Sequence, residues 1–240
     1  MAVDGDEGLV DPEMTITEHL EELRWRILKS LAAVFIGTAA VWSRSGEALS
    51  WLAKPVGSLV FVAPTEAFFT RLKVAMFAGA MLALPFVLYQ AWAFTACALP
   101  RGARKAVALI VPASYVFFVS GVCLAVFVVV PTAVGFLISY GSTAVTPMLS
   151  VASYIEFVVG LSIAFGIVFQ LPLVLIFLHR AGLVGRASLA AKRRYIYFAA
   201  FVVAAVMTPG PDVFSQFALA IPIILLFEAS LLAMRWTGER

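Results

Sequence analysis

The chain has few of the residues that build soluble catalytic sites. Its 240 residues include two cysteines and two histidines, and only 13% are charged, against about 25% in an ordinary soluble domain. Glycine-rich phosphate loops, zinc-ligand spacings and nucleophile elbows do not occur. Cys97 falls in an expected loop and Cys123 in an apolar segment, so no disulfide is expected. The sequence therefore predicts no catalytic residue, cofactor, metal site or nucleic-acid contact, and a protein that is not an enzyme.

Positive charge is absent from the start of the chain. Residues 1–22 contain eight acidic residues and no Lys or Arg. A cleavable signal peptide begins with a basic region, so we expect none here. Residues 1–14 are predicted to form a solvated acidic tail on the cytoplasmic side.

Hydrophobic sequence, in contrast, dominates the chain. Hydrophobic residues make up 62% of it, and a helix needs roughly 20 mainly apolar residues to cross a bilayer. We expect an all-α, polytopic membrane protein with one domain over residues 15–236, embedded in the lipid bilayer, and a short tail over residues 237–240. Six spans are expected, over residues 27–42, 68–94, 106–130, 153–179, 195–207 and 213–234.

The expected spans differ in length and regularity. The fifth and sixth are expected to be short, and a helix over residues 195–207 reaches roughly 20 Å, against about 30 Å of hydrocarbon. We expect Pro85 to kink the second span, Pro131 to end the third, and Pro172 to lie inside the fourth. Residues 15–26 read as a short amphipathic helix at the interface, and residues 43–67 as a mixed loop.

The distribution of Lys and Arg predicts the orientation. With the N-terminus inside, 13 of the 17 basic residues lie on the inner side. Basic residues favour the cytoplasmic side of a membrane. An even number of spans returns the chain to its starting side, so we expect both termini in the cytoplasm, in a cell inner membrane.

Three polar residues stand out against this apolar background. Glu22 lies at the inner start of the first helix, where an ordinary pair with Arg26 is the simplest role. Gln170 and Glu228 lie within the fourth and sixth spans, where a polar group needs a partner. Gln170 could bond a backbone carbonyl that Pro172 frees, or line a membrane-open groove together with Phe165. Glu228 is a functional candidate that could equally pair with a neighbouring helix.

Several strings, taken in order, resemble one family. Residues 19–26 read HLEELRWR, residues 64–68 PTEAF, and residues 89–94 YQAWAF after Pro85. Further matches are AFG at 164–166, FQLP at 169–172, TPGPDVFSQ at 208–216, AIP at 220–222 and LFE at 226–228. Together, from about residue 15 to 236, they resemble TatC, the multi-spanning receptor subunit of the twin-arginine (Sec-independent) protein translocase.

The resemblance implies a function and a set of site residues. A TatC-like chain binds the twin-arginine signal peptides of folded cargo on the cytoplasmic face. It works with TatA-like and TatB-like single-span partners, self-associates, and uses the proton-motive force. The implied signal-peptide residues are Glu22, Arg24 and Phe94, and Glu21 is added because it lies beside Glu22. The implied partner or groove residues are Gln170, Phe165, Asp212 and Glu228, and Glu66 and Pro85 are further family-motif residues.

The chain departs from the family pattern in the loop after Phe94. Ala103 stands where the second signal-binding carboxylate is expected, and Cys97 stands where proline is expected. Glu21 or Glu18, on the same short helix as Glu22, could supply the second charge. A small-solute or ion transporter is the alternative to the receptor, because Pro-broken spans with polar groups also suit a transporter. Transporters commonly show paired internal repeats, and residues 1–120 and 121–240 show no convincing similarity.

Overall fold

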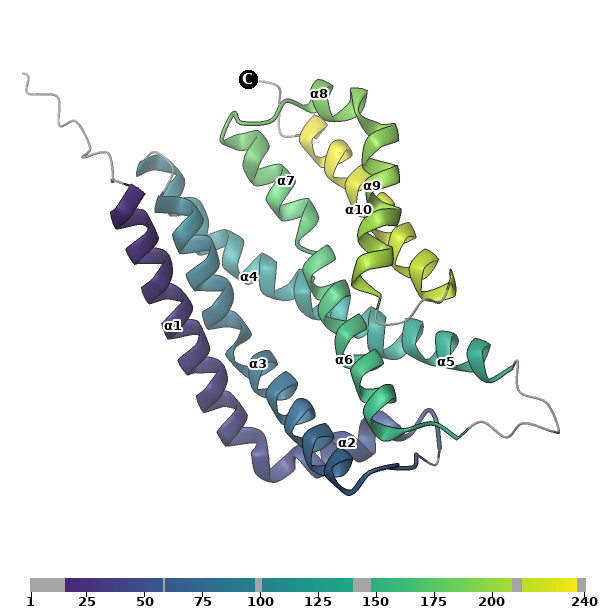
Figure 1. Ribbon diagram of the computed structural model, residues 1–240. Helices are drawn as coiled ribbons and strands as arrows, with labels where there is room; N and C mark the ends of the chain where they lie inside the picture. The colour runs from purple at the N-terminus through teal and green to yellow at the C-terminus, as the bar shows by residue number, and fades with distance from the viewer. Residues whose placement is uncertain (1–15, 58, 98–100, 140–147, 209–212, 237–240) are drawn as a thin grey trace, which may run out of the picture.

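A computed structural model describes residues 16–57, 59–97, 101–139, 148–208 and 213–236, which are helical apart from short connections and one isolated bridge, Val60 to Ser150 (Figure 1). The predicted tails, residues 1–14 and 237–240, lie outside this description. The helices are α1 (Ile16–Val41), η1 (Trp42–Arg44), α2 (Ser45–Ala53), α3 (Pro64–Cys97), α4 (Arg101–Leu124), η2 (Ala125–Val129), α5 (Val130–Ile138), α6 (Val151–Val168), α7 (Leu171–Arg180), α8 (Arg186–Ala191), α9 (Arg193–Met207) and α10 (Val213–Trp236).

The predicted all-α membrane fold is confirmed. Within the described residues, five helical stretches are long and apolar enough to cross a membrane: Thr17–Ala53, Pro64–Thr95, Ile110–Ile138, Val151–Arg180 and Val213–Arg235. The remaining expected span corresponds to α9, whose 15 residues reach about 22 Å. The sixth span is not short, contrary to the prediction. α10 has 24 residues, because the helix continues through Pro222 to Trp236.

The helices α1 and α3 run side by side over most of their length (Figure 1). The expected amphipathic stretch at residues 15–26 is not a separate element, because one continuous helix of 26 residues runs from Ile16 to Val41. A Cβ added to Gly79 would lie 2.3 Å from the backbone nitrogen of Thr38. Only glycine allows the two backbones to approach so closely, as small residues do in other membrane helix pairs.

The prediction for Pro131 was wrong, and that for Pro172, which lies inside the span Val151–Arg180, was confirmed. Pro131 does not end the third span: α4 passes through the π-helical η2 into α5, and Pro131 lies in the first turn of α5. A proline ring clashes with the carbonyl four residues earlier, here that of Phe127, and the wider π turn relieves this clash. The fourth span, by contrast, is interrupted. α6 ends at Val168, the residue four before Pro172, and α7 begins at Leu171.

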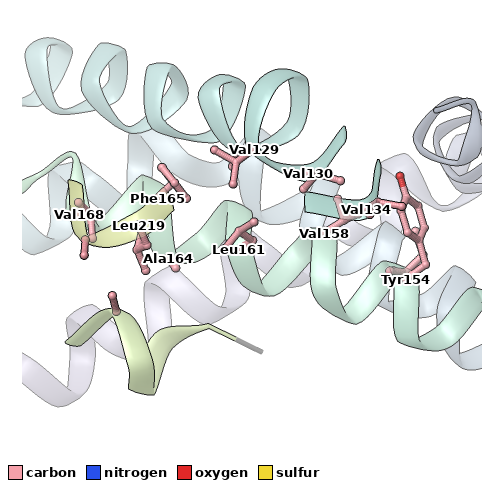
Figure 2. Close-up of a cluster of buried hydrophobic side chains, with 14 of the residues drawn as sticks. Val129, Val130, Val134, Tyr154, Val158, Leu161, Ala164, Phe165, Val168 and Leu219 are labelled. Carbon is pink, nitrogen blue, oxygen red and sulfur yellow. The ribbon is translucent and has the colours of Figure 1, made fainter. Parts of the chain in front are cut away.

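The main hydrophobic core lies where α6 meets η2, α5, α9 and α10. Figure 2 shows valines of η2 and α5 gathered with Leu161 and Phe165 of α6 and Leu219 of α10. The core also includes Leu52 of α2, a helix within the segment that was expected to be a loop. The hydroxyl of Tyr154 donates to the carbonyl of Leu52 at 2.7 Å. This contact ties α2 to the start of α6.

Candidate functional site

A charged cluster joins α1 to α3 near the start of α1. Arg26 donates from Nε and Nη2 to Oε1 of Glu22, at 3.0 and 2.6 Å, and from Nη1 to Oε1 of Gln90 at 3.1 Å. The Glu22 and Arg26 side chains are only 21% and 19% exposed, and Gln90 is buried. The predicted pair of Glu22 with Arg26 is thus present. Its extension to Gln90 was not anticipated, because 64 residues separate Gln90 from Arg26.

Two aromatic rings lie beside this cluster. His19 of α1 stacks on Phe94 of α3, with ring centroids 4.4 Å apart and planes 22° apart. His19, Glu22 and Arg26 follow a helical spacing of three and four residues, which places them on one face of α1. The same spacing relates Gln90 to Phe94 on α3. This periodicity could have revealed His19 as a member of the site.

A cavity of about 530 Å³ opens next to the cluster, between α1 and α3. Arg26, Gln90, Ser30 and Thr95 supply its polar groups. The rest of its lining is Leu23, Ile27, Leu31, Val34, Val87, Ala91 and Phe94. Its size lies within the range of about 300–1,000 Å³ that is typical of ligand sites. The site therefore combines a carboxylate, a guanidinium and an apolar chamber.

Two of the other expected signal-peptide residues, Glu21 and Arg24, lie around this site but not inside it. Glu21 and Arg24 are exposed. Glu21 lies one residue before Glu22 and Arg24 two residues after it, so both side chains leave α1 from other faces of the helix. Phe94 is part of the site. The structure does not describe the side chain of Ala103, whose backbone lies in the first turn of α4.

Gln170 lies at the junction between α6 and α7. Its Nε2 donates to the carbonyl of Ser114 in α4 at 2.9 Å, so the expectation of a backbone partner is right. The particular carbonyl was predicted wrongly, because the carbonyl that Pro172 frees belongs to Val168. Ser114 also accepts a hydrogen bond from Trp92 of α3 at 2.6 Å, through its Oγ. This buried network connects three helices.

Phe165 does not face a membrane-open groove, contrary to the prediction. Its side chain is fully buried. Phe165 lies four and seven residues after Leu161 and Val158, and these spacings place all three on the core-facing side of α6. Since they pack in the main core (Figure 2), Phe165 is part of the fold.

Glu228 pairs with the neighbouring helix α9. Arg193 Nη2 donates to its Oε2 at 2.8 Å, and the Tyr197 hydroxyl donates to its Oε1 at 2.5 Å. Of the two roles considered for Glu228, a functional one and pairing with a neighbouring helix, the structure shows the pairing. Asp212 lies outside the described residues. Within the described part of the chain, His, Cys, Asp and Glu residues form no group of three or more that could hold a metal ion.

Glu66 lies in the first turn of α3, at the end of the α1–α3 pair that is opposite to Glu22, and it accepts four hydrogen bonds there. One of its oxygens accepts from the backbone nitrogens of Val62 and Ala63, at 2.7 and 3.4 Å. The other accepts from the Ala152 nitrogen at 2.8 Å and from the Ser150 hydroxyl. These donors tie the segment before α3 to the N-terminus of α6. Pro85 lies inside α3, which continues past it.

Comparison with known proteins agrees with this arrangement. The family model described as Sec-independent protein translocase protein (TatC) matches residues 18–222. The TatC protein of Carboxydothermus hydrogenoformans is 37% identical over 240 residues, covering 96% of this chain and 99% of that protein. That of Aquifex aeolicus is 37% identical over 226 residues, covering 91% of this chain and 93% of that protein.

A solved structure matches as well. The crystal structure of the twin-arginine translocase receptor TatC superposes with a TM-score of 0.81 at 36% identity, covering 92% of this chain and all of that one. This agreement extends over nearly the whole chain. The chain therefore belongs to the TatC family of Sec-independent protein translocase components.

Proposed function

We propose that this chain is the core receptor of a twin-arginine protein translocase and that Glu22 receives an arginine of the signal peptide. One observation carries the proposal: Glu22 already holds a guanidinium, that of Arg26, at the polar end of an apolar cavity. A signal-peptide arginine carries the same planar group. Carboxylates bind that group through charge-assisted hydrogen bonds that lysine reproduces poorly.

Binding proceeds by exchange in this proposal. The incoming guanidinium replaces Arg26 on Glu22, while Arg26 keeps its hydrogen bond to Gln90. The second arginine of the signal reaches Glu21 or Glu18 on the outer faces of the same helix turn. Arg24 and Phe94 border the bound peptide, and the Phe94 ring, held by His19, supplies a flat apolar surface.

The cavity between α1 and α3 takes the apolar part of the signal peptide. Export signals carry an apolar segment of about 7–15 residues after their charged start. The cavity extends away from Arg26 and Gln90 between leucine, isoleucine and valine side chains. The cavity therefore presents polar groups first and apolar groups next, in the same order as the charged start and the apolar segment of such a signal.

The charge distribution supports the orientation that this function requires. If the chain lies in a cell inner membrane with both termini in the cytoplasm, 13 of its 17 basic residues lie on the cytoplasmic side. The start of α1 then faces the compartment where cargo folds. Six spans, with α9 as a short fifth span, complete this topology.

We further propose that TatA-like and TatB-like single-span proteins assemble with further copies of this chain and that the proton-motive force drives transport. Gln170 is one candidate contact, because its Oε1 is buried and accepts no hydrogen bond from the described part of the chain. A donor on a partner helix would satisfy it once the α6–α7 junction opens. Asp212 and Glu228 are further candidates. A photo-crosslinker at position 170 should yield partner adducts that increase when cargo is present.

Peptide binding to the purified full chain in lipid tests the receptor site. A labelled twin-arginine signal peptide should bind about tenfold more tightly than the same peptide with two lysines, a difference of about 1.4 kcal/mol. Glu22→Gln should remove this preference, because the charge holds the guanidinium. Glu47→Gln, at an exposed glutamate of α2, is the matched control and should bind as the wild type does. Undiminished selectivity in Glu22→Gln would refute the site.

A further inference from the structure

A second cavity borders the first at Val34 and Val87 and extends from there over the face formed by α3, α4 and α6. It is a groove of about 630 Å³. Its walls are apolar and include Met76, Leu84 and Leu88 of α3, Phe118 of α4, and Ile163 and Ile167 of α6. The only charged residues in its lining are Lys73 and Glu156.

These two charges form an ion pair between α3 and α6. The Lys73 and Glu156 side chains remain 44% and 57% exposed. An ammonium group has three hydrogens to donate and a carboxylate has about four lone-pair positions, so each partner can bind a second polar group. In a membrane such groups must find polar partners, because hydrocarbon offers none.

The ion pair lies close to a membrane interface. Lys73 follows two residues after Arg71, whose guanidinium lies 5.7 Å from the ring centre of Trp42. Tryptophan and snorkelling basic residues mark the headgroup level of membranes. From Lys73 to Leu88 the groove extends about 22 Å along α3. One end of the groove is therefore polar at headgroup level, and the rest is apolar at hydrocarbon level.

We propose that this groove binds a zwitterionic phospholipid whose headgroup carries a primary ammonium, of the phosphatidylethanolamine class. Lys73 donates hydrogen bonds to the phosphate, Glu156 accepts from the ammonium, and one acyl chain lies along the apolar walls. Lys73 and Glu156 carry opposite charges, which matches a headgroup that has one positive and one negative group. An anionic headgroup without an ammonium would offer Glu156 no second cationic donor besides Lys73, and choline has no N–H to donate.

A partner helix fits the groove less well. A helix with its side chains is about 10 Å across, whereas an acyl chain is a single file of carbon atoms. Such a helix would also have to carry its own polar groups at the level of Lys73 and Glu156. A phospholipid has a polar end and an apolar remainder in the required order.

Native mass spectrometry of the full chain tests the proposal. The chain is equilibrated with phosphatidylethanolamine, phosphatidylcholine or phosphatidylglycerol carrying identical acyl chains. We expect phosphatidylethanolamine to be retained about fivefold more than either of the others, which corresponds to about 1 kcal/mol. Glu156→Gln should remove the preference over phosphatidylglycerol. Ala80→Phe, which fills the groove, should reduce retention of all three lipids.

Matched controls separate this site from general lipid contact. Glu47→Gln and Ala39→Phe change exposed residues that do not line the groove, and they should retain lipid as the wild type does. Should Glu156→Gln fail to fold, lipids with stepwise N-methylated headgroups test the same contact on the wild-type chain. Each methyl group removes one N–H donor, so retention should fall with each methylation. Equal retention of all headgroups would overturn the proposal. So would a photo-crosslinker at Ile163 that captures protein instead of lipid in native membranes.

Discussion

Glu22 and Glu66 lie toward opposite ends of the α1–α3 pair, and they are bound by different kinds of donor. The donors to Glu22 include a flexible side chain, the guanidinium of Arg26. Glu66 accepts mainly from backbone nitrogens, those of the nearby Val62 and Ala63 and that of Ala152, which is 86 residues away in sequence. A side chain can be exchanged for a ligand group without changing the fold, whereas backbone donors cannot. The comparison teaches that Glu22 is suited to binding and Glu66 to holding the structure.

The largest expected effect is the sidedness of thiol labelling, which reports whether the Glu22 end or the Glu66 end of the chain faces the cytoplasm. In a variant without Cys97 and Cys123, a cysteine at Ser188 should react with an impermeant thiol reagent only from the cytoplasmic side. A cysteine at Met148 should react only from the opposite side. Both positions are exposed, so lack of reaction reports sidedness instead of burial. Labelling of position 188 from outside would reverse the assignment of the Glu22 end as the receptor face.

Alanine substitutions of the two glutamates should separate binding from stability. Glu66→Ala leaves several backbone donors without their acceptor, so we expect the larger fall in Tm in lipid–detergent micelles. Glu22→Ala should lower Tm by at most about 2–4 °C, because a part-exposed i,i+4 pair contributes less than about 1 kcal/mol. The same Glu22→Ala chain should lose signal-peptide binding. Equal losses of Tm would show that both carboxylates are structural.

Ser150→Ala should have a smaller effect at the Glu66 junction. It removes one hydroxyl donor to Glu66 and the cap on the α6 N-terminus, while the Ala152 nitrogen remains. Loss of a cap costs about 1 kcal/mol, or about 2–4 °C in Tm for a chain of this size. Ser50→Ala, at an exposed serine of α2, is the control. A loss as large as that of Glu66→Ala would mean that the backbone donors contribute little.

The smallest effect is expected for Arg26→Gln. If the signal arginine displaces Arg26 from Glu22, removing the competitor should tighten binding of the twin-arginine peptide by about threefold, or about 0.6 kcal/mol. Lys29→Gln removes a neighbouring charge that lies outside the Glu22–Arg26–Gln90 cluster and corrects for the general change in electrostatics. Weaker binding in Arg26→Gln alone would show that Arg26 helps to hold the peptide.

Much of the fold could be predicted because apolar segment length and the spacing of basic residues are local properties. The structure confirms long apolar helices at the expected places and the Glu22–Arg26 pair, which is separated by one helical turn. The helix α2 was missed, because a nine-residue helix is stabilised mainly by tertiary contacts. Here these include Tyr154 with Leu52 and Arg71 with Ser45.

The candidate site could be predicted only in part, for the same reason. Glu22 and Phe94 were expected, but the hydrogen bond from Arg26 to Gln90 joins two helices that are distant in sequence. Phe165 was expected to line a membrane-open groove together with Gln170, five residues later in the sequence. The face of α6 that carries Phe165 could have been read from its helical spacing to Leu161 and Val158. Which neighbours bury that face depends on the tertiary arrangement.

The π-helical turn η2 has a consequence for insertions and deletions. A π turn contains about one residue more than an α turn. Deleting one residue from Ala125–Val129 would let a regular α turn cover nearly the same rotation about the helix axis with one residue fewer. Val130, Ala133 and Val134 of α5, which are buried, would therefore keep facing the core. A one-residue deletion within η2 should thus disturb this packing less than one within the regular helix α4, which would rotate everything after it by about 100°.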